Sequence, residues 1–577
     1  MKTGSLMVAI LLPCLTGCGQ STGSGGGAAP GAPATVSSAP AAHAMPALPG
    51  SVAEWARGAQ IFDGLGTSHR AITTSSPEAQ QYFDQGLRLM WGFNHDEATR
   101  SFAKAAELDP HCGSCYWGVA YTVGPNYNLP FLSAARAKVA FEARGLAERN
   151  VAGATPVEQA LIAALAQRHP AARPLDPAAA LPVLTAFAGA MRTVAQRFPQ
   201  DLDVQTLYAE SLMNINAWKL WSRDGKPAPG TEEIIATLKG VLARDPEHPG
   251  ANHYYVHAVE ASPHPEDGVE AARRLMALEP AAGHMVHMPA HIMVRIGRYE
   301  EAAEANRRGA SADMAYAARA RPPDYYPTMY TAHNYQFLAY AAAMEGRRAE
   351  TIAAVDNSRK SVSDAMLAGM PGVDWCVAES YTARARFGLW PELLEMPAPD
   401  PSLVALTGGY LFGRALAQAA TGQLAQSRST VQQLRAIAAG PKAQLPAGMN
   451  TLGDVLAVAI PVVEARIAAA EHRSAEAVRL LRQAVEREDH LAYNEPKDWF
   501  FPVRHLLGAE LLGAGAAADA ERVYREDLAQ NPGNGWSLYG LGMALDAQGK
   551  AAEARQARKA YAAAWQHADV QLTSSAF

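Results

Sequence analysis

The sequence lacks several features that would place it in a common functional class. No run of Lys and Arg forms a nucleic-acid-binding footprint, and the formal net charge is only −6 over 577 residues. Beyond the amino terminus, no stretch reaches the roughly 18 uninterrupted apolar residues of a membrane span. Neither a Walker loop nor a serine–histidine–aspartate arrangement is apparent. We therefore expect no nucleic-acid partner and no transmembrane helix.

The amino terminus carries a predicted signal peptide, residues 1–17. Lys2 supplies positive charge, residues 7–12 are apolar, and the segment that ends at Cys18 resembles a bacterial lipobox. The resemblance implies cleavage before Cys18 and lipidation of that cysteine, palmitate included, so that the protein is anchored in a lipid bilayer. Gly19, in place of Asp, favours the outer membrane. The alternative is an ordinary secretory signal with a chance cysteine.

Cysteine is scarce, with five residues in the whole chain. Cys112 and Cys115 form a C-x-x-C pair, but the pair has no following His for haem attachment, no second pair for a zinc ribbon and no βαβ context for a redox site. Because an envelope protein meets an oxidising environment, we expect a local disulfide between Cys112 and Cys115.

The rest of the chain divides by composition. Residues 18–50 are mostly Gly, Ala, Ser and Pro, which cannot bury enough surface to fold and predict a flexible linker. From residue 51 to 577, alanine-rich amphipathic segments alternate with short Pro and Gly breaks, and no sustained strand alternation is seen. This pattern predicts an all-α region.

Small residues and prolines recur in this region at a fixed spacing. The spacing resembles the tetratricopeptide repeat (TPR), a helix-turn-helix unit of about 34 residues. It predicts a right-handed, TPR-type superhelical solenoid with inserted loops, in which small residues allow close helix packing. The positions that carry the resemblance are Gly86, Leu89, Ala98, Phe102, Ala105 and Pro110, then Leu507, Gly508, Leu511, Gly515, Ala520, Tyr524 and Pro532, and again Gly542, Gly549 and Ala554.

Six histidines fall in the same frame, within repeats that span about 249–350. The frame places repeat starts at Pro249, Gly283 and, after an insertion, near Ala332. By the TPR resemblance, positions two, five, nine and twelve of each first helix face the concave groove. All six histidines take such positions, as do two groove carboxylates: His253, His257, His284, His287, His291 and His333, with Glu260 and, from an earlier helix over 203–218, Glu210.

Imidazole is the commonest metal ligand among side chains, and neighbouring helices lie close enough for several rings to meet. We therefore predict one transition-metal site whose ligands come from the six histidines, with Glu210 or Glu260 nearby. Zn, Cu, Fe or Ni suits such a set better than Ca or Mg. The alternative is a metal-free polar groove in which the histidines bind carbonyls or an acidic or aromatic ligand.

Several longer segments resemble a family of bacterial TPR lipoproteins without established activity. The resemblance runs over nearly the whole mature chain, so it supports the fold without supplying a function. The segment over 495–504 is expected either to cap one end of the groove or to be an insertion packed for stability. The segments that carry the resemblance are 92–95, 124–128, 214–225, 248–260, 287–291 and 494–499.

Two function classes remain. The first is an envelope-anchored scaffold, facing the periplasm or the cell surface, which binds a protein, peptide or small molecule in its groove and holds a metal there. The second is a metal-dependent enzyme with its active site in the groove. The sequence favours the first, because TPR grooves usually bind ligands, although a fold alone does not decide function.

Overall fold

The computed structural model describes residues 48–576, apart from 131, 176, 324 and 371. Within this part the chain is predominantly helical, and the only strands are β1 (Pro446–Ala447) and β2 (Asn450–Thr451), which pair antiparallel. The predicted all-α helical-repeat class is therefore confirmed. The predicted signal peptide and Cys18 lie outside the described residues.

Most helices follow one another with short turns, and longer connections lie over 57–76, 217–230 and 489–502. The first third contains α1 (Val52–Ala56), α2 (Pro77–Trp91), α3 (His95–Leu108), α4 (Gly113–Thr122), α5 (Ala134–Arg149), α6 (Pro156–Arg168), α7 (Pro177–Arg197), α8 (Leu202–Met213), η1 (Asn214–Asn216) and α9 (Thr231–Leu242). The middle contains α10 (Pro249–Val259), η2 (Pro265–Gly268), α11 (Val269–Leu278), α12 (Gly283–His287), α13 (Pro289–Arg295), α14 (Tyr299–Ala320), the π-helical turn η3 (Pro327–Thr331), α15 (Ala332–Met344) and α16 (Arg348–Ser361). The last part contains α17 (Asp364–Gly369), α18 (Val373–Cys376), α19 (Glu379–Arg386), α20 (Trp390–Glu395), α21 (Val404–Ala420), α22 (Leu424–Ala439), η4 (Pro441–Gln444), α23 (Leu452–Ala470), α24 (Ser474–Glu488), α25 (Val503–Gly513), α26 (Ala517–Gln530), α27 (Gly535–Ala547) and α28 (Ala551–Ala564).

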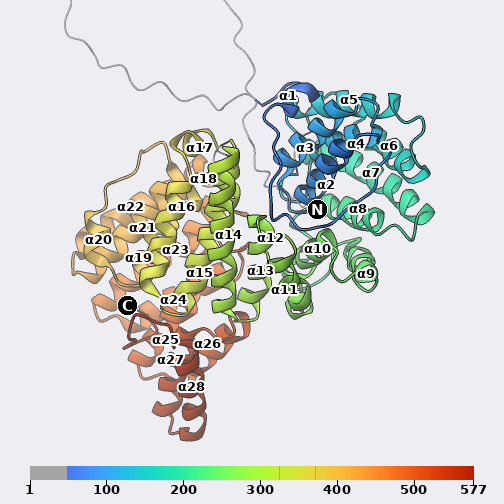
Figure 1. The fold of residues 1–577 in the computed structure, drawn as a ribbon. Helices are drawn as coiled ribbons and strands as arrows, with labels where there is room; N and C mark the ends of the chain where they lie inside the picture. The colour runs from blue at the N-terminus through green and yellow to red at the C-terminus, as the bar shows by residue number, and fades with distance from the viewer. Residues whose placement is uncertain (1–47, 131, 176, 324, 371, 577) are drawn as a thin grey trace, which may run out of the picture.

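Consecutive helices pack as pairs, as in α2 with α3, α15 with α16, α23 with α24 and α27 with α28. Helices α1–α9 gather on the right of Figure 1, α10–α13 lie in the middle, and the later helices occupy the left. Contacts between distant segments tie these parts together. The Tyr316 hydroxyl donates to Glu97 at 3.1 Å, and the Trp536 indole donates to the Ala343 carbonyl at 2.8 Å. The middle of the chain therefore contacts both its beginning and its end.

Two glycines of the repeat frame, Gly86 and Gly508, lie where helices approach closely, and so does Gly540 outside the frame. A Cβ on Gly86 would lie 2.8 Å from the Phe102 ring. Near the carboxyl end, a Cβ on Gly508 or Gly540 would lie 2.3 or 2.2 Å from the Tyr524 ring. Such distances are sterically forbidden, so these positions accept only glycine unless the aromatic ring moves. Gly86 and Gly508 therefore serve the close packing that the sequence predicts, whereas Gly515 and Gly549 have positive φ values and no heavy atom within 4 Å of an added Cβ.

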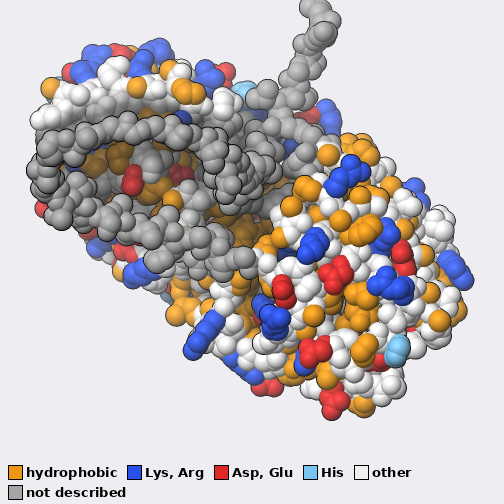
Figure 2. All heavy atoms as spheres, turned by 90° about the horizontal axis from the view of Figure 1, so that it is seen from above, with side chains coloured by type: hydrophobic (Ala, Val, Ile, Leu, Met, Phe, Trp, Pro, Cys, Tyr) orange, Lys and Arg blue, Asp and Glu red, His pale blue; other side chains and the backbone are white. Residues whose placement is uncertain are grey.

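The described surface is mixed in character. Over the N-terminal helices, on the right in Figure 2, Lys and Arg side chains are interspersed with Asp and Glu. A few large apolar side chains are exposed, as is ordinary for a folded protein. They are Leu108, Phe141, Leu181, Met314 and Met543. None of the helices in the described segments combines the length and the apolar character that crossing a membrane requires.

Candidate metal centre

Four helices of the middle repeats supply the six histidines. His253 and His257 lie on α10, His284 and His287 on α12, His291 on α13 and His333 on α15. The observed helices begin at Pro249, Gly283 and Ala332, as the repeat frame predicts. At the start of α10, the His248 side chain accepts a hydrogen bond from the backbone N–H of Ala251, and Pro249 occupies the first helical turn.

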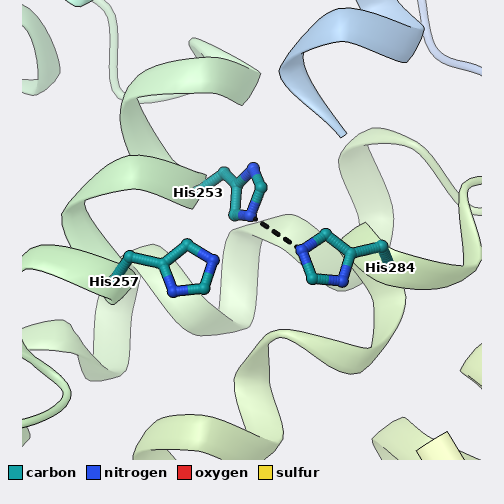
Figure 3. A group of neighbouring side chains, drawn as sticks. All are labelled: His253, His257 and His284. Carbon is teal, nitrogen blue, oxygen red and sulfur yellow. Dashed lines mark hydrogen bonds between the residues drawn. The ribbon is translucent and has the colours of Figure 1, made fainter. Parts of the chain in front are cut away.

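The first three histidines form a compact group, which we call trio 1: His253, His257 and His284. Their nearest ring nitrogens all lie within 4.8 Å of one another, and the Nε2 atoms of His253 and His284 are 3.1 Å apart. Figure 3 shows the three rings around a common space, with His253 and His284 joined by the dashed line. The side chains are almost completely buried. Trio 1 therefore has the size of a single metal site.

The other three histidines form a second group, which we call trio 2: His287, His291 and His333. Their ring nitrogens also fall within 4.8 Å of one another, and the Nε2 atoms of His287 and His291 are 2.9 Å apart. His287 and His291 are buried, whereas His333 is partly exposed. Trio 2 thus repeats the arrangement of trio 1 with residues from α12, α13 and α15.

The outer nitrogens of several rings are held by acceptors. Nδ1 of His253 donates to the Trp91 carbonyl oxygen at 2.5 Å. Nδ1 of His287 donates to Oδ1 of Asn306 at 2.7 Å, and the Asn306 amide nitrogen donates in turn to the Ala302 carbonyl, which fixes the amide orientation. A ring whose Nδ1 carries the proton presents an unprotonated Nε2. The sequence did not indicate Trp91 or Asn306, because both contacts arise between separate repeats.

Glu260 contacts one histidine of each trio. Its Oε1 accepts from Nδ1 of His257 at 3.0 Å, and its Oε2 lies 2.5 Å from Nδ1 of His291. Oε2 of Glu495 lies 3.2 Å from the same His291 nitrogen. The predicted carboxylate Glu260 is thus part of the cluster, as an outer partner of the imidazoles. Metal-ligating histidines commonly donate their second N–H to a carboxylate or carbonyl in this way.

Glu495 is a member of the site that sequence reasoning did not identify as such. The segment that contains it was singled out and was expected to cap the groove or to pack for stability. Just before this segment, the Tyr493 hydroxyl contacts the Glu495 carboxylate, and the Arg295 guanidinium lies over the Tyr493 ring at 5.4 Å. Glu495 therefore brings this segment into contact with the cluster at His291.

Aromatic rings wall off both trios. The Phe93 ring lies 4.6 Å from that of His253, and the Phe337 ring lies 4.7 Å from that of His291. Tyr127 and Trp218 stack on each other and both contact His257. The expectation of histidines lining an open groove therefore needs correction. The turn after α2 and the segments around residues 127, 218 and 495 fold over the concave face, so that most of the cluster is interior.

Two of these wall residues have unusual backbones. Phe93 and Trp218 have φ values of 55° and 60°, in the left-handed region that side chains other than glycine rarely adopt. Such conformations persist only where the surrounding contacts enforce them, and they concentrate at functional sites. Both strained residues point their rings at the histidine cluster.

The remaining predicted carboxylate, Glu210, is held elsewhere. Its two oxygens accept hydrogen bonds from the Tyr121 hydroxyl at 2.5 Å and the Asn214 amide at 2.7 Å. The structure does not bring Glu210 into either trio. The predicted helix over 203–218 in fact ends at Met213 and continues as η1, but Glu210 lies within it, and its partners Tyr121 and Asn214 account for its position. Glu210 is therefore a buried structural carboxyl.

Burial is the largest influence on the pKa values of the clustered histidines. It lowers the pKa of His253, His284 and His287 well below the usual value, and the neighbouring imidazoles add to the effect. It lowers the pKa of His333 to about 3. At His291, burial lowers the pKa, but the carboxylates of Glu260 and Glu495 outweigh burial and raise it. In the ligand-free protein most rings of the cluster are therefore neutral at pH 7, the form that binds metals.

The predicted local disulfide is present. Cys112 and Cys115 are bonded at the start of α4, and both are fully buried. Cys376, at the end of α18, is free. The disulfide lies on a different helix from the histidines.

No family model and no curated protein matches this chain. Among solved structures, similarity is seen to a human IFIT1 dimer with m7Gppp-AAAA (TM-score 0.31, 11% identity, 79% of this chain and 90% of that chain). Yeast Tom70 (TM-score 0.28, 12% identity, 83% and 90%) and a Naa15/Naa10 complex with HypK-THB (TM-score 0.21, 16% identity, 85% and 70%) are also similar. All are helical-repeat proteins of the TPR type. Similarity this low does not transfer a ligand or an activity.

Proposed function

We propose that this chain is a TPR-type protein that binds a first-row transition metal in its buried histidine cluster. One observation carries the proposal: ring nitrogens of two histidine trios converge, while acceptors hold the opposite nitrogen of His253, His257 and His287. Nδ1 of His253 donates to Trp91, Nδ1 of His287 to Asn306 and Nδ1 of His257 to Glu260. The remaining Nε2 lone pairs thus face one another inside the protein, which is the arrangement that a metal stabilises.

The donor set favours particular metals. The inner donors are imidazole nitrogens, and the nearby carboxylates of Glu260 and Glu495 contact the outer nitrogen of His291. Zn, Cu, Fe and Ni accept imidazole donors, whereas Ca and Mg require oxygen. We therefore propose one of the first four as the natural metal.

A metal-free hydrogen-bonded network is the competing interpretation. In that case one histidine of each close Nε2 pair must donate its proton to the other. His257 argues against this interpretation, because its Nε2 is buried without a hydrogen-bond partner while its Nδ1 is held by Glu260. An unsatisfied buried polar atom is costly unless a ligand meets it.

We further propose that the protein is a lipoprotein of the bacterial envelope, as its resemblance to bacterial TPR lipoproteins implies. The lipobox that ends at Cys18 supports a lipid anchor, and Gly19 supports the outer membrane. In this proposal the solenoid is a scaffold for a protein, peptide or small molecule, and the metal stabilises the region where the repeats meet.

A metal-dependent enzyme is the second candidate. It is favoured by the number of donors in each trio, since catalytic metal sites commonly have three protein ligands and one open position. The aromatic walls of Phe93, Phe337 and Trp218 would restrict such an enzyme to small substrates.

Metal content of purified variants tests the proposal. Changing His257 or His287 to Ala removes one donor from trio 1 or trio 2, so we expect reduced metal content by elemental analysis with unchanged helical content by circular dichroism. The matched control is His264→Ala, because that histidine is nearby in sequence but its side chain is 74% exposed. If both cluster variants keep full metal content, the metal-binding proposal is wrong.

A further inference from the structure

We infer that the histidine cluster is a dinuclear centre, in which trio 1 and trio 2 each hold one metal ion. This inference rests on the proposed metal-binding function and deepens it. The sequence predicted a single site, because the frame gives the direction of each histidine but not how the rings group in space. The grouping comes from the distances.

The two trios have the same internal organisation. In each, one ring is central and has a neighbour on either side: His253 lies 4.9 Å from both His257 and His284, and His287 lies 4.8 and 4.9 Å from His291 and His333, between ring centroids. Each central ring shares a close Nε2 pair with one neighbour. The centre thus consists of two halves with the same arrangement of rings.

Each half also has its own wall. Phe93 contacts every ring of trio 1, at centroid distances of 4.6, 5.8 and 5.9 Å. Phe337 contacts every ring of trio 2, at 4.9, 4.7 and 5.1 Å. A single phenylalanine therefore packs against each trio. This pairing is expected if each trio is a unit, and it has no reason to occur if the six rings serve one ion.

Coordination geometry favours two ions over one. Metal–nitrogen bonds of about 2.0–2.1 Å keep the donors of one ion within about 4.2 Å of each other. The donors of each trio already lie within 4.8 Å of one another, so each set can close on an ion with small ring movements. Six imidazoles would crowd a single ion, whereas three per ion leave an open position on each.

The two halves are close enough to act together. His284 and His287 are almost one turn apart on α12, with ring centroids 5.7 Å apart, and His257 and His291 are 5.6 Å apart. Glu260 joins the halves, because one oxygen contacts His257 and the other His291. Two-metal sites in proteins commonly place the ions about 3.5–4 Å apart.

Charge identifies the additional ligand. Two divalent ions on neutral imidazoles bring a charge of +4 into the interior, and the adjacent carboxylates of Glu260 and Glu495 offset only part of it. Uncompensated buried charge is costly. The open positions of the two ions therefore favour a small shared anion such as hydroxide, which would offset part of the remaining charge.

Zinc stoichiometry is the first test. Wild-type protein loaded with Zn(II) and dialysed should retain two ions per chain. His253→Gln in trio 1 and His333→Gln in trio 2 should each retain one, and the exposed control His264→Gln should retain two. A wild-type value of one would overturn the dinuclear inference while leaving the proposed function intact. A value of zero would overturn both.

Electron paramagnetic resonance of the protein loaded with Cu(II) gives a second test, and the wild type alone decides it. Two Cu(II) ions within about 4 Å couple magnetically and lose most of the isolated-ion signal. We expect that loss in the wild type and recovery of an isolated Cu(II) signal in His333→Gln. Full isolated-ion signal for every copper bound to the wild type would contradict the inference.

Discussion

Nδ1 of His291 lies 2.5 Å from Oε2 of Glu260, although the two residues belong to different repeats. The other oxygen of Glu260 accepts from His257, which lies on α10, the helix that Glu260 caps at its carboxyl end. One carboxylate therefore orients an imidazole from each half of the cluster. Burial raises the pKa of Glu260, but His291 and His257 outweigh burial and lower it, so the group is an anion at neutral pH.

Glu260→Gln should weaken metal binding by both trios. The neutral amide cannot accept from two imidazoles as a carboxylate does, and loss of such an outer partner typically costs about 10–100-fold in metal affinity. Competition with a chromophoric chelator measures the change. Glu266→Gln is the matched control, because Glu266 is exposed and pairs only with exposed His264. Equal affinities in the two variants would show that Glu260 does not orient the ligands.

Gly508→Ala should destabilise the carboxyl-terminal repeats. The new Cβ would lie 2.3 Å from the Tyr524 ring, and overpacking of this kind costs about 1–3 kcal/mol. Gly513 lies on the same helix with no heavy atom within 4 Å of its added Cβ, so Gly513→Ala should leave stability unchanged or slightly increased. Chemical denaturation compares the two. Equal loss in both variants would contradict the close-packing account of the repeat frame.

Lowering the pH should reduce the free energy of unfolding, because the protein loses the stabilisation that ionised Glu158 provides. Burial raises the pKa of its carboxyl, but hydrogen bonds from Ser114, Thr73 and Thr155 outweigh burial and lower it to about 2. Because the pKa is lower in the folded state than in the unfolded chain, the stabilisation is complete above about pH 4.5 and is lost as the pH falls towards 2. The contribution is at most about 3 kcal/mol.

Urea unfolding of wild type and Glu158→Gln at about pH 6 and about pH 3 checks this linkage. The wild type should be more stable than the variant at the higher pH, and the difference should shrink at the lower pH. A difference that stays constant between the two conditions would assign the effect to lost packing and not to ionisation of Glu158.

Cys18→Ala should release the protein from membranes. The lipobox prediction makes Cys18 the only lipid attachment point, and no helix in the described part of the chain can span a bilayer. Envelope fractionation with a high-salt wash measures the distribution. A variant that still sediments with the envelope would contradict the lipid-anchor proposal.

Local patterns explain how much of the site the sequence could predict. The repeat frame correctly placed the helix starts at Pro249, Gly283 and Ala332, and thereby brought the six histidines to one region. This success depended on side-chain periodicity within each helix, which is a local property. The all-α class followed from the same patterns.

Contacts between distant segments explain what the sequence could not predict. Phe93, Trp91 and Glu495 reach the histidines only because the amino-terminal repeats and the segment before α25 fold over the concave face. Asn306 lies on a different helix from its partner His287, and nothing in its spacing marks it as an acceptor. Glu210 shared the frame with the histidines, yet Tyr121 and Asn214 hold it elsewhere. The position of a residue in the repeat therefore predicts which side of its helix it lies on, but not which residues it contacts.

X-ray absorption at the metal edge of the purified wild-type protein tests the central claim most directly. The account predicts bound first-row metal whose first shell is dominated by nitrogen at about 2.0–2.1 Å, with the outer-shell scattering that imidazole rings produce. Protein that retains no metal after exposure to Zn(II) or Cu(II) at neutral pH, or a bound metal whose first shell lacks imidazole scattering, would contradict the account.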